Sequence, residues 1–352
     1  MNILRDYIDS WYDGNRDKIF AITDKDPEVA HEKFIRLARI IWGLGLEKLL
    51  LDCSENKNNP GFEISNAGGF NKNGKIPPTF LRSLGFDRIV VGTVTGDSWE
   101  GDPKPRIKRY SNTNSMVNWM GLPGVGAEEV ARNLESYGNH KVPITINLMS
   151  TPGKEGQKLI DDLEKTILKM RDLPFVDRYE LNISCPNTHG ASGGMDARRE
   201  YMGQLNDMLS VICSVSYSYQ KIWQKVSPDQ DIDGVRDTIK ISRTHKVEGF
   251  VIGNTTTIHD SKFITSPPNR EGKGGASGDA VYETSKNVQD IFYREITEQG
   301  LNYKIIACGG INSDKRALER TMNGNKKIKG IQIFTPLIFK GSKLLRELRT
   351  SA

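Results

Sequence analysis

Residues 88–94 read RIVVGTV, a short run that is apolar almost throughout and rich in β-branched residues. A strand with one buried face alternates apolar and polar residues, whereas a nearly continuous apolar run is typical of a strand covered on both faces. Seven further β-rich runs recur along the chain, at 62–68, 144–149, 179–184, 221–227, 249–255, 304–310 and 330–336. The sequence therefore predicts eight short strands, several of them buried on both sides.

Helical patterns fill most of the gaps between these runs. Apolar residues recur at three- and four-residue spacing in 127–138 and 156–173. Four other gaps are similar, at 195–218, 231–245, 281–299 and 313–323. Strands that alternate with helices predict an α/β fold, here a closed (β/α)8 TIM barrel. An open doubly wound sheet is the alternative, but it would normally carry a GxGxxG turn after its first strand, and AGGFNKNG at 67–74 does not match that pattern.

Two parts of the chain lie outside a minimal barrel. Residues 1–60 are expected to form an N-terminal helical extension ahead of a barrel domain at 61–352, with 26–51 as the best helical segment. The extension either packs on the bottom of the barrel or forms a small cap that covers a tunnel or touches a membrane surface. Residues 95–123 contain two short strand-like runs and predict a hairpin over the top of the barrel.

Composition limits the classes of function. The chain has 352 residues with a formal net charge of +5, and it contains no long Lys/Arg run, so nucleic acid is not an expected partner. No apolar run of about 18 residues predicts a transmembrane helix, and the N-terminus has no signal-peptide core. The 4 cysteines form no CxxC pair, no His lies nearby at zinc-ligand spacing, and no metal site is predicted. These features together favour a cytoplasmic protein.

Polar side chains gather where the predicted strands end, which is where (β/α)8 barrels place their chemistry. Amides and two lysines dominate these positions, with almost no acids. Amides offer both a donor and an acceptor, which suits a flat heterocycle with alternating C=O and N–H groups. One Asn after a strand is commonly a turn residue, but six strand ends agree. The predicted set comprises Gly68, Gly69, Asn71, Lys72, Thr93, Asn147, Asn182, Cys185, Asn187, Lys225, Asn254 and Thr255.

Two further features point to a bound anion. Lys225 lies inside the apolar run KIWQKVS and is expected to be buried, where an ammonium group without a partner is costly. A ligand contact is therefore favoured for this lysine. Gly309 and Gly310 precede the helical segment 313–323 and could present backbone N–H groups to a phosphate.

Several of these segments, taken in order, resemble the dihydroorotate dehydrogenase family. They are AGGFNKNG, GTVT at 92–95, GDPKPR at 101–106, NISCPNT at 182–188 and the Gly pair at 309–310. The resemblance extends over roughly residues 25–350. It implies a (β/α)8 barrel that binds FMN and oxidises dihydroorotate to orotate in pyrimidine biosynthesis.

The resemblance also implies roles for single residues. Cys185 would be the base that removes a proton from C5 of the substrate while hydride leaves C6, and Lys225 would offset charge that builds on the flavin. FMN would be held by Gly68, Gly69, Lys72, Thr93, Asn147, Asn182, Lys225, Gly278, Gly310, Phe334 and Thr335. The substrate would be held by Lys72, Asn118, Met120, Gly121, Leu122, Asn187, Asn254 and Thr255.

The resemblance combines two branches of that family. NISCPN and NWMGLPG resemble the soluble class 1, whose base is cysteine, whereas DPEVAHEKF, AGGFNKNG and VIGNTTT resemble the membrane-associated, quinone-reducing class 2. Arg109 lies where class 2 places a quinone-contacting arginine, and Phe334 replaces the usual tyrosine. Quinone and fumarate therefore stay open as electron acceptors. A homodimer and a peripheral contact of residues 1–60 with the inner face of a membrane stay open too.

Two other functions are compatible with the same residues. A flavin barrel of this kind could act on a related dihydropyrimidine such as dihydrouracil, which lacks the carboxylate that Lys72 would bind. A catalytically silent flavin-binding protein is the third hypothesis, and the joint presence of Cys185, Lys225 and the asparagines argues against it.

Overall fold

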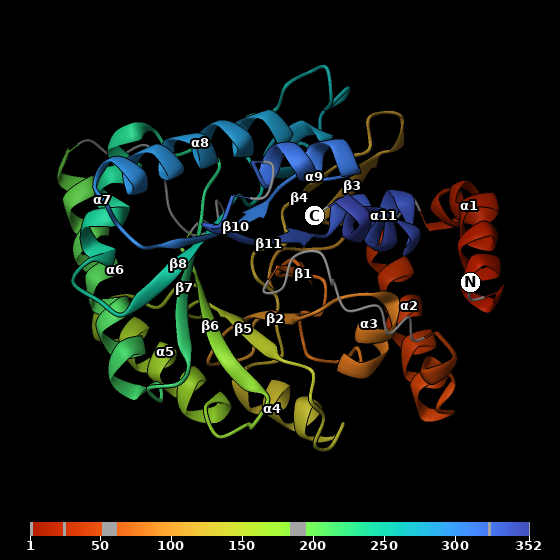
Figure 1. Ribbon diagram of the computed structural model, residues 1–352, viewed down its shortest axis with the longest axis horizontal. Helices are drawn as coiled ribbons and strands as arrows, with labels where there is room; N and C mark the ends of the chain where they lie inside the picture. The colour runs from red at the N-terminus through yellow and green to blue at the C-terminus, as the bar shows by residue number, and fades with distance from the viewer. Residues whose placement is uncertain (1–2, 24–25, 51–61, 184–194, 323–324, 352) are drawn as a thin grey trace.

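The structure is a computed structural model that describes residues 3–23, 26–50, 62–183, 195–322 and 325–351. Eight parallel strands form its central sheet, in the order β1-β11-β10-β8-β7-β6-β5-β2 (Figure 1). They coincide with the eight predicted runs, which confirms the predicted (β/α)8 fold. The strands are β1 (Glu63–Asn66), β2 (Ile89–Val94), β5 (Ile144–Leu148), β6 (Val176–Asn182), β7 (Lys221–Val226), β8 (Val247–Ile252), β10 (Lys304–Cys308) and β11 (Ile328–Ile333).

The first and last strands in this order meet and close the barrel. A parallel bridge joins Ser65 of β1 to Arg88 just before β2. One residue further along, Asn66 Nδ2 donates to the carbonyl of Val90 at 2.7 Å, and Val90 N donates to Asn66 Oδ1 at 3.0 Å. A side-chain amide thus replaces a backbone pair in the ladder. This closure excludes the open doubly wound sheet.

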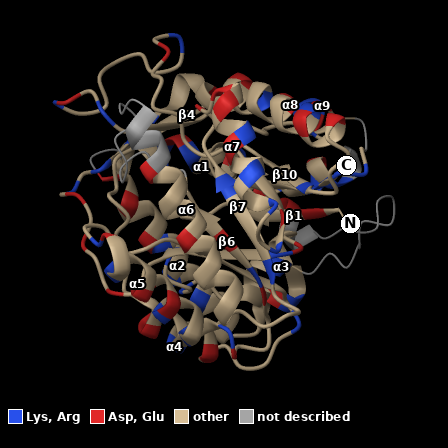
Figure 2. Cartoon of the chain, turned by 90° about the vertical axis from the view of Figure 1, so that its left-hand side faces the viewer, with Lys and Arg blue, Asp and Glu red and all other residues tan. Residues whose placement is uncertain are grey.

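Helices surround the barrel, and apolar residues from both layers form one continuous core. Six of these helices fall within the predicted segments, and basic and acidic residues are interspersed along them, as on α4, α5 and α8 in Figure 2. The helices are α3 (Pro78–Leu84), α4 (Ala127–Glu135), α5 (Gly156–Met170), α6 (Met195–Val215), α7 (Ile232–Ser242), α8 (Tyr282–Glu298) and α9 (Asp314–Arg320), followed by α10 (Thr335–Lys340) and α11 (Lys343–Ser351).

A small antiparallel sheet forms from the segments between barrel strands. The predicted hairpin is present as β3 (Ile107–Tyr110) and β4 (Ser115–Asn118), joined by the 3-10 turn η2 (Ser111–Thr113). A third strand, β9 (Gly275–Gly278), pairs with β4. The sequence did not predict β9 as a strand, because GASG has none of the β-branched or aromatic residues that mark strands. Pairing with β4 makes it one.

The N-terminal extension consists of α1 (Ile3–Thr23), α2 (Pro27–Gly43) and the 3-10 helix η1 (Leu46–Leu50). Asp26 caps α2 by accepting a hydrogen bond from Glu28 N at 3.0 Å, and Pro27 occupies the first helical position. Among the described helices, none is long and apolar enough to cross a membrane. The proposed domain boundary at residue 60 lies outside the described residues, so the division at 60/61 stays a prediction.

Contacts of the extension decide between the two arrangements expected for it. Salt bridges join α1 to α11, Lys343 to Asp13 and Arg346 to Asp9, and the two helices lie side by side in Figure 1. The His31 ring of α2 packs against Phe70, with ring centroids 5.7 Å apart. Phe70 follows the carboxyl end of β1, so the extension lies beside the carboxyl ends of the strands and not across the barrel bottom.

Candidate active site

Four predicted side chains form one hydrogen-bonded chain at the carboxyl ends of the barrel strands. Asn254 Nδ2 donates to Asn182 Oδ1 at 3.1 Å, and Asn182 Nδ2 donates to Thr93 Oγ1 at 2.9 Å. Thr93 Oγ1 in turn donates to Asn147 Oδ1 at 2.6 Å. These residues come from β6, β2 and β5 and from the segment after β8. The structure therefore brings together side chains that lie far apart in the sequence, as the strand-end argument expects.

Lys225 is buried, as predicted, with 3% relative exposure. Its Nζ donates to Gln332 Oε1 at 3.2 Å and lies 3.9 Å from Glu180 Oε1. The Glu180 carboxylate also accepts hydrogen bonds from Asn147 Nδ2 at 2.7 Å and from Gln332 Nε2 at 2.6 Å. The expectation of almost no acids at this site is therefore wrong in one respect, because a fully buried glutamate lies at its centre.

Glu180 and Gln332 contact the candidate site residues, and sequence reasoning missed both, although a signal was present. Each stands two positions before a predicted site residue, Asn182 and Phe334, and alternate residues of a strand share one face. Because Asn182 points into the barrel, Glu180 does too. Both residues lie within predicted strands that are otherwise mostly apolar, so the sequence analysis did not single them out.

An apolar cluster fills the barrel interior beside this polar network. It contains Trp223 and Cys308 together with Ala67, Val251 and Ile306, and the partly buried Phe334 packs against it. Such a cluster excludes water from the interior, which strengthens electrostatic interactions among the buried polar groups.

Charged groups near the amino ends of the strands form a separate network. Glu63 pairs with Arg88 and Arg178, and Arg88 also pairs with Asp177. Burial alone would raise the pKa of Glu63, but the two arginines more than offset this and hold that pKa below its usual value. These residues close the barrel end opposite to the candidate site, so we assign them a structural role.

The loop after β1 packs its glycines against two other predicted residues. A Cβ at Gly68 would lie 3.1 Å from Asn147 Cγ, and a Cβ at Gly69 would lie 3.3 Å from Phe334 Cε1. Gly69 N also donates to the carbonyl of Gly92 at 2.6 Å. Glycines here allow close approach of the backbone to the side chains of the site. Lys72 follows in the same loop and is partly buried.

Three segments with residues predicted to hold FMN, at Gly278, Gly310 and Thr335, meet at one place. A Cβ at Gly310 would lie 2.7 Å from the carbonyl oxygen of Gly278, and one at Gly278 would lie 2.9 Å from Thr335 Cγ2. Thr335 Oγ1 donates to Ser277 Oγ at 2.9 Å. Both glycines have positive φ angles, +79° and +66° for Gly278 and Gly310. Glycine is therefore needed at both positions, because a side chain at either one would collide with the neighbouring turn.

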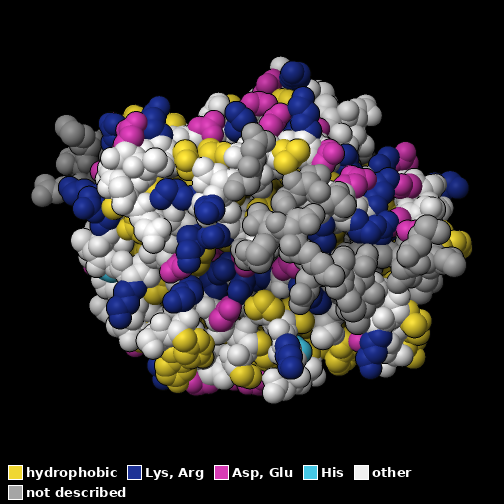
Figure 3. Space-filling view, in the orientation of Figure 1, with side chains coloured by type: hydrophobic (Ala, Val, Ile, Leu, Met, Phe, Trp, Pro, Cys, Tyr) yellow, Lys and Arg dark blue, Asp and Glu magenta, His cyan; other side chains and the backbone are white. Residues whose placement is uncertain are grey.

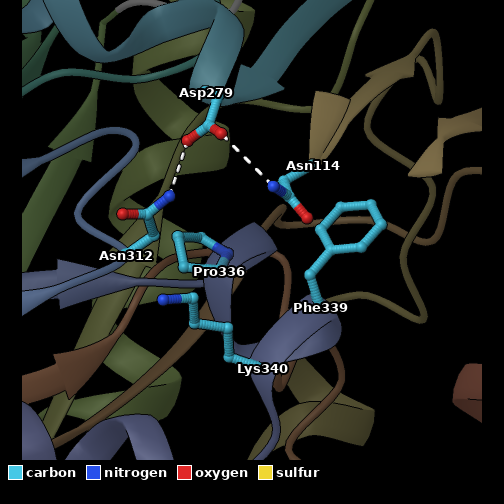
Figure 4. Close-up of a pocket in the computed structure, with 6 residues that line it drawn as sticks. All are labelled: Asn114, Asp279, Asn312, Pro336, Phe339 and Lys340. Carbon is cyan, nitrogen blue, oxygen red and sulfur yellow. Dashed lines mark hydrogen bonds between the residues drawn. The ribbon is translucent and has the colours of Figure 1, made fainter. Parts of the chain in front are cut away.

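Asp279 ties these turns to their surroundings. Its carboxylate accepts hydrogen bonds from Asn312 at 2.7 Å and Asn114 at 3.4 Å, as Figure 4 shows, and it forms a salt bridge with Arg316. Arg316 also donates to the carbonyl of Gly310 at 2.9 Å. Side chains of α10 line the same pocket as Asp279, Asn312 and Asn114 (Figure 4). Asp279 thus holds the β9 turn and the Gly310 turn in one arrangement.

The predicted substrate residues of 118–122 lie beside β9 and Asp102. Asn118 Nδ2 donates to the carbonyl of Gly275 at 3.3 Å, and a Cβ on Gly275 would lie 2.1 Å from Thr255 Oγ1. Asn118 and Thr255 therefore both lie against Gly275. Met120 accepts from Asp102 N at 3.0 Å, while Gly121 and Leu122 both have positive φ angles. No hydrogen bond among the described residues joins Met120, Gly121 or Leu122 to the amide chain.

Two predicted site residues, Cys185 and Asn187, lie outside the described residues. Asn182, the last residue of β6, precedes them in the sequence. Their roles as base and as substrate contact stay predictions.

Arg109 of β3 contacts the extension. Its guanidinium donates to Thr23 Oγ1 at 3.1 Å and to the carbonyl of Pro27 at 3.4 Å, and it lies 4.5 Å from the centroid of the Phe20 ring. Beside it, a cavity of about 350 Å³ opens between α1, η2 and α10. Its lining includes Arg16, Phe20, Ser111, Asn112 and Phe339.

Comparisons with known proteins agree with this architecture. The family model described as dihydroorotate dehydrogenase matches residues 55–351. A protein of Acidithiobacillus ferrooxidans named dihydroorotate dehydrogenase (quinone) is 30% identical over 89% of this chain and 80% of its own length. One of the same name from Janthinobacterium sp. is 28% identical over 94% of each chain.

A solved structure supports the fold. The crystal structure of DHODH in complex with ferulenol from Eimeria tenella superposes with a TM-score of 0.75, at 21% sequence identity, over 95% of this chain and 93% of the other. At that identity the likeness shows the fold alone. With the family model covering most of the barrel, the conclusion is that this chain belongs to the dihydroorotate dehydrogenase family.

Proposed function

We propose that this chain oxidises dihydroorotate to orotate in pyrimidine biosynthesis, with FMN as its cofactor. The observation that carries the proposal is the hydrogen-bonded chain from Asn254 through Asn182 and Thr93 to Asn147, which reaches Lys225 through Glu180. Membership of the family supports the same reaction. Neither dihydrouracil oxidation nor a catalytically silent role is favoured by these observations.

The described residues fit an FMN group. When bound, FMN supplies a ring that accepts hydride, which no side chain does. Lys225, Asn147, Asn182 and Thr93 would hold that ring through buried donors and acceptors. The glycine-lined turns at Gly278, Gly310 and Thr335 would bind its phosphate with backbone groups, and Gly68, Gly69, Lys72 and Phe334 would complete the site.

We assign substrate recognition to the side of the flavin ring opposite these contacts. Lys72 would pair with the carboxylate of dihydroorotate, and Asn118, Asn187, Asn254 and Thr255 would hold the ring, together with the backbone of 120–122. Cys185 would take the proton from C5. A thiol has an ordinary pKa near 8.5, so closeness to the substrate and exclusion of water would have to support this step.

A quinone is the electron acceptor that we propose. Both bacterial relatives carry quinone in their names, and the extension encloses Arg109 next to a cavity of about 350 Å³. Several apolar side chains of α2 are exposed, among them Leu37 and Ile40. Figure 3 shows hydrophobic side chains at the surface over this part of the molecule, on the right of the view. We propose that this face makes the peripheral membrane contact through which the quinone enters.

Spectroscopy tests the reaction. The purified protein should be yellow, and anaerobic dihydroorotate should bleach it, while dihydrouracil should not. A colourless protein that takes up no FMN would show the proposal to be wrong.

Substitution of Cys185 by Ser should slow bleaching sharply at pH 7, and the rate of the native protein should climb with pH toward the thiol pKa.

Turnover tests the acceptor. Steady-state oxidation of dihydroorotate would be compared with a short-chain quinone, fumarate, NAD and oxygen in the same preparation. The highest rate is expected with the quinone. A preference for fumarate would reject the quinone proposal and would leave residues 1–60 with a packing role only.

A further inference from the structure

The Glu180 carboxylate fixes which atoms donate and which accept in the hydrogen-bonded chain that begins at it. An ionised carboxylate only accepts hydrogen bonds, whereas an amide both donates and accepts. Asn147 must therefore turn its Nδ2 toward Glu180, which leaves its Oδ1 to accept from Thr93. Thr93 Oγ1 then accepts from Asn182 Nδ2, and Asn182 Oδ1 accepts from Asn254. The Glu180 carboxylate, as the last acceptor, therefore fixes the orientation of every amide in the chain.

Gln332 is oriented in the same way from the other side. Its Nε2 donates to Glu180 at 2.6 Å, so its Oε1 is the atom that accepts from Lys225 Nζ at 3.2 Å. Gln332 comes from β11 and Glu180 from β6, and these strands are not neighbours in the sheet. The contact therefore crosses the interior of the barrel. It ties the position of the Lys225 ammonium to the Glu180 carboxylate.

The charge of Glu180 matters as well as its geometry. The residue has 0% relative exposure, and its Oε1 lies 3.9 Å from Lys225 Nζ. In a dry interior a charge acts over longer distances than in water. Lys225 and Asn147, which Glu180 contacts, are two residues proposed to hold the flavin ring. The negative charge on Glu180 therefore opposes part of the positive field that Lys225 provides there.

We propose that Glu180 is a positioning residue that orients the amide chain and lowers the reduction potential of the bound FMN. The inference rests on the proposed function, since it needs FMN at this site. Reduction adds negative charge to the flavin ring. A buried carboxylate nearby disfavours that charge, whereas Lys225 favours it. The potential should therefore lie between the value that Lys225 alone would give and the value that Glu180 alone would give.

The test is the midpoint potential of the bound flavin in Glu180→Gln, measured by anaerobic spectroelectrochemistry. The substitution keeps the shape of the side chain and removes its charge. The potential is expected to rise by about 30 mV or more, which is about tenfold in the two-electron equilibrium. Glu295→Gln is the matched control: Glu295 is also buried, but on α8 outside the barrel, where it pairs with Arg236. The midpoint potential of the flavin in Glu295→Gln should equal that in the native protein.

The outcomes separate this inference from the proposed function. A native protein without FMN refutes the function. A yellow Glu180→Gln protein with an unchanged or lowered potential refutes the inference and leaves the function standing. If Glu180→Gln binds no flavin, the charge-conserving Glu180→Asp decides: recovered binding supports the role of the carboxylate, and loss of binding in both variants overturns it.

Discussion

The side-chain amide of Asn66, at the end of β1, forms hydrogen bonds with both backbone groups of Val90 in β2. These two strands are the first and last in the order of the sheet, and they share few other ladder contacts. Asn66 thus takes the place of a backbone pair at the closure of the barrel. The next residues along both strands lead directly into the candidate site.

Substitution of Asn66 by Ala should destabilise the protein. It leaves the buried N–H and C=O of Val90 without partners, and each unsatisfied buried group costs about 1–3 kcal/mol. Urea unfolding of the two proteins would measure the difference in the free energy of unfolding. Asn133→Ala is the control, because it removes one hydrogen bond, to the carbonyl of Asn73, at a less buried site. An equal effect of the two substitutions would contradict a special role of Asn66 in closure.

Substitution of Gly310 by Ala should weaken FMN binding by at least about tenfold, or about 1.4 kcal/mol. The new Cβ would lie 2.7 Å from the carbonyl oxygen of Gly278 and would push apart the turns proposed to hold the phosphate. Gly300 has a similar φ of +63°, with nothing within 4 Å of its Cβ position. Gly300→Ala should therefore cost only the about 1–2 kcal/mol of left-handed strain and leave FMN affinity unchanged. Fluorescence titration of the apoprotein with FMN compares them, and equal affinities would refute the phosphate assignment.

Substitution of Arg109 by Leu should impair the reaction with quinone and spare the reaction with dihydroorotate. The change removes the charged hydrogen bonds to Thr23 and Pro27, worth about 1.5–3 kcal/mol each. A rise of about tenfold or more in KM for quinone is expected, with an unchanged rate of anaerobic bleaching. Arg132→Leu, which removes an exposed arginine of α4, should change neither quantity. Slower bleaching in Arg109→Leu would show that this arginine acts in the oxidation of dihydroorotate and not only in the reaction with quinone.

Stability should fall below pH 6.5, and His31 should account for part of the fall. Burial lowers the pKa of His31 from its ordinary value of 6.5, while a hydrogen bond with the backbone of Phe70 acts in the opposite direction. The unfolded chain therefore binds more protons than the folded one just below pH 6.5, so protonation favours unfolding as pH falls through that window. The slope is at most about 1.4 kcal/mol per pH unit for this one group.

The variant His31→Gln isolates this contribution, because glutamine retains a donor for Phe70 but does not titrate. Free energies of unfolding would be measured at pH 7.5 and 5.5 for both proteins. His140, whose pKa burial also lowers, is present in both and cancels in the comparison. The loss of stability on acidification should be smaller in the variant. Identical losses would show that His31 titrates alike in the folded and unfolded states.

The sequence alone determined the eight barrel strands, since a strand buried on both faces must be apolar along most of its length. It also predicted that Asn147, Asn182, Lys225 and Asn254 lie together, because barrels gather the carboxyl ends of their strands at one rim. The strand β9 was missed, since its residues have no strand preference of their own and pair only where β4 provides an edge.

Only the tertiary structure decided which of these side chains touch. Alternation along β6 places Glu180 on the face of Asn182, but it cannot show that Gln332 meets that carboxylate from the far side of the barrel. That contact exists because closure through Asn66 and Val90 brings non-neighbouring strands within hydrogen-bonding reach. Local sequence specifies which face of a strand is buried, whereas the partner of a buried charge depends on the curvature of the whole sheet.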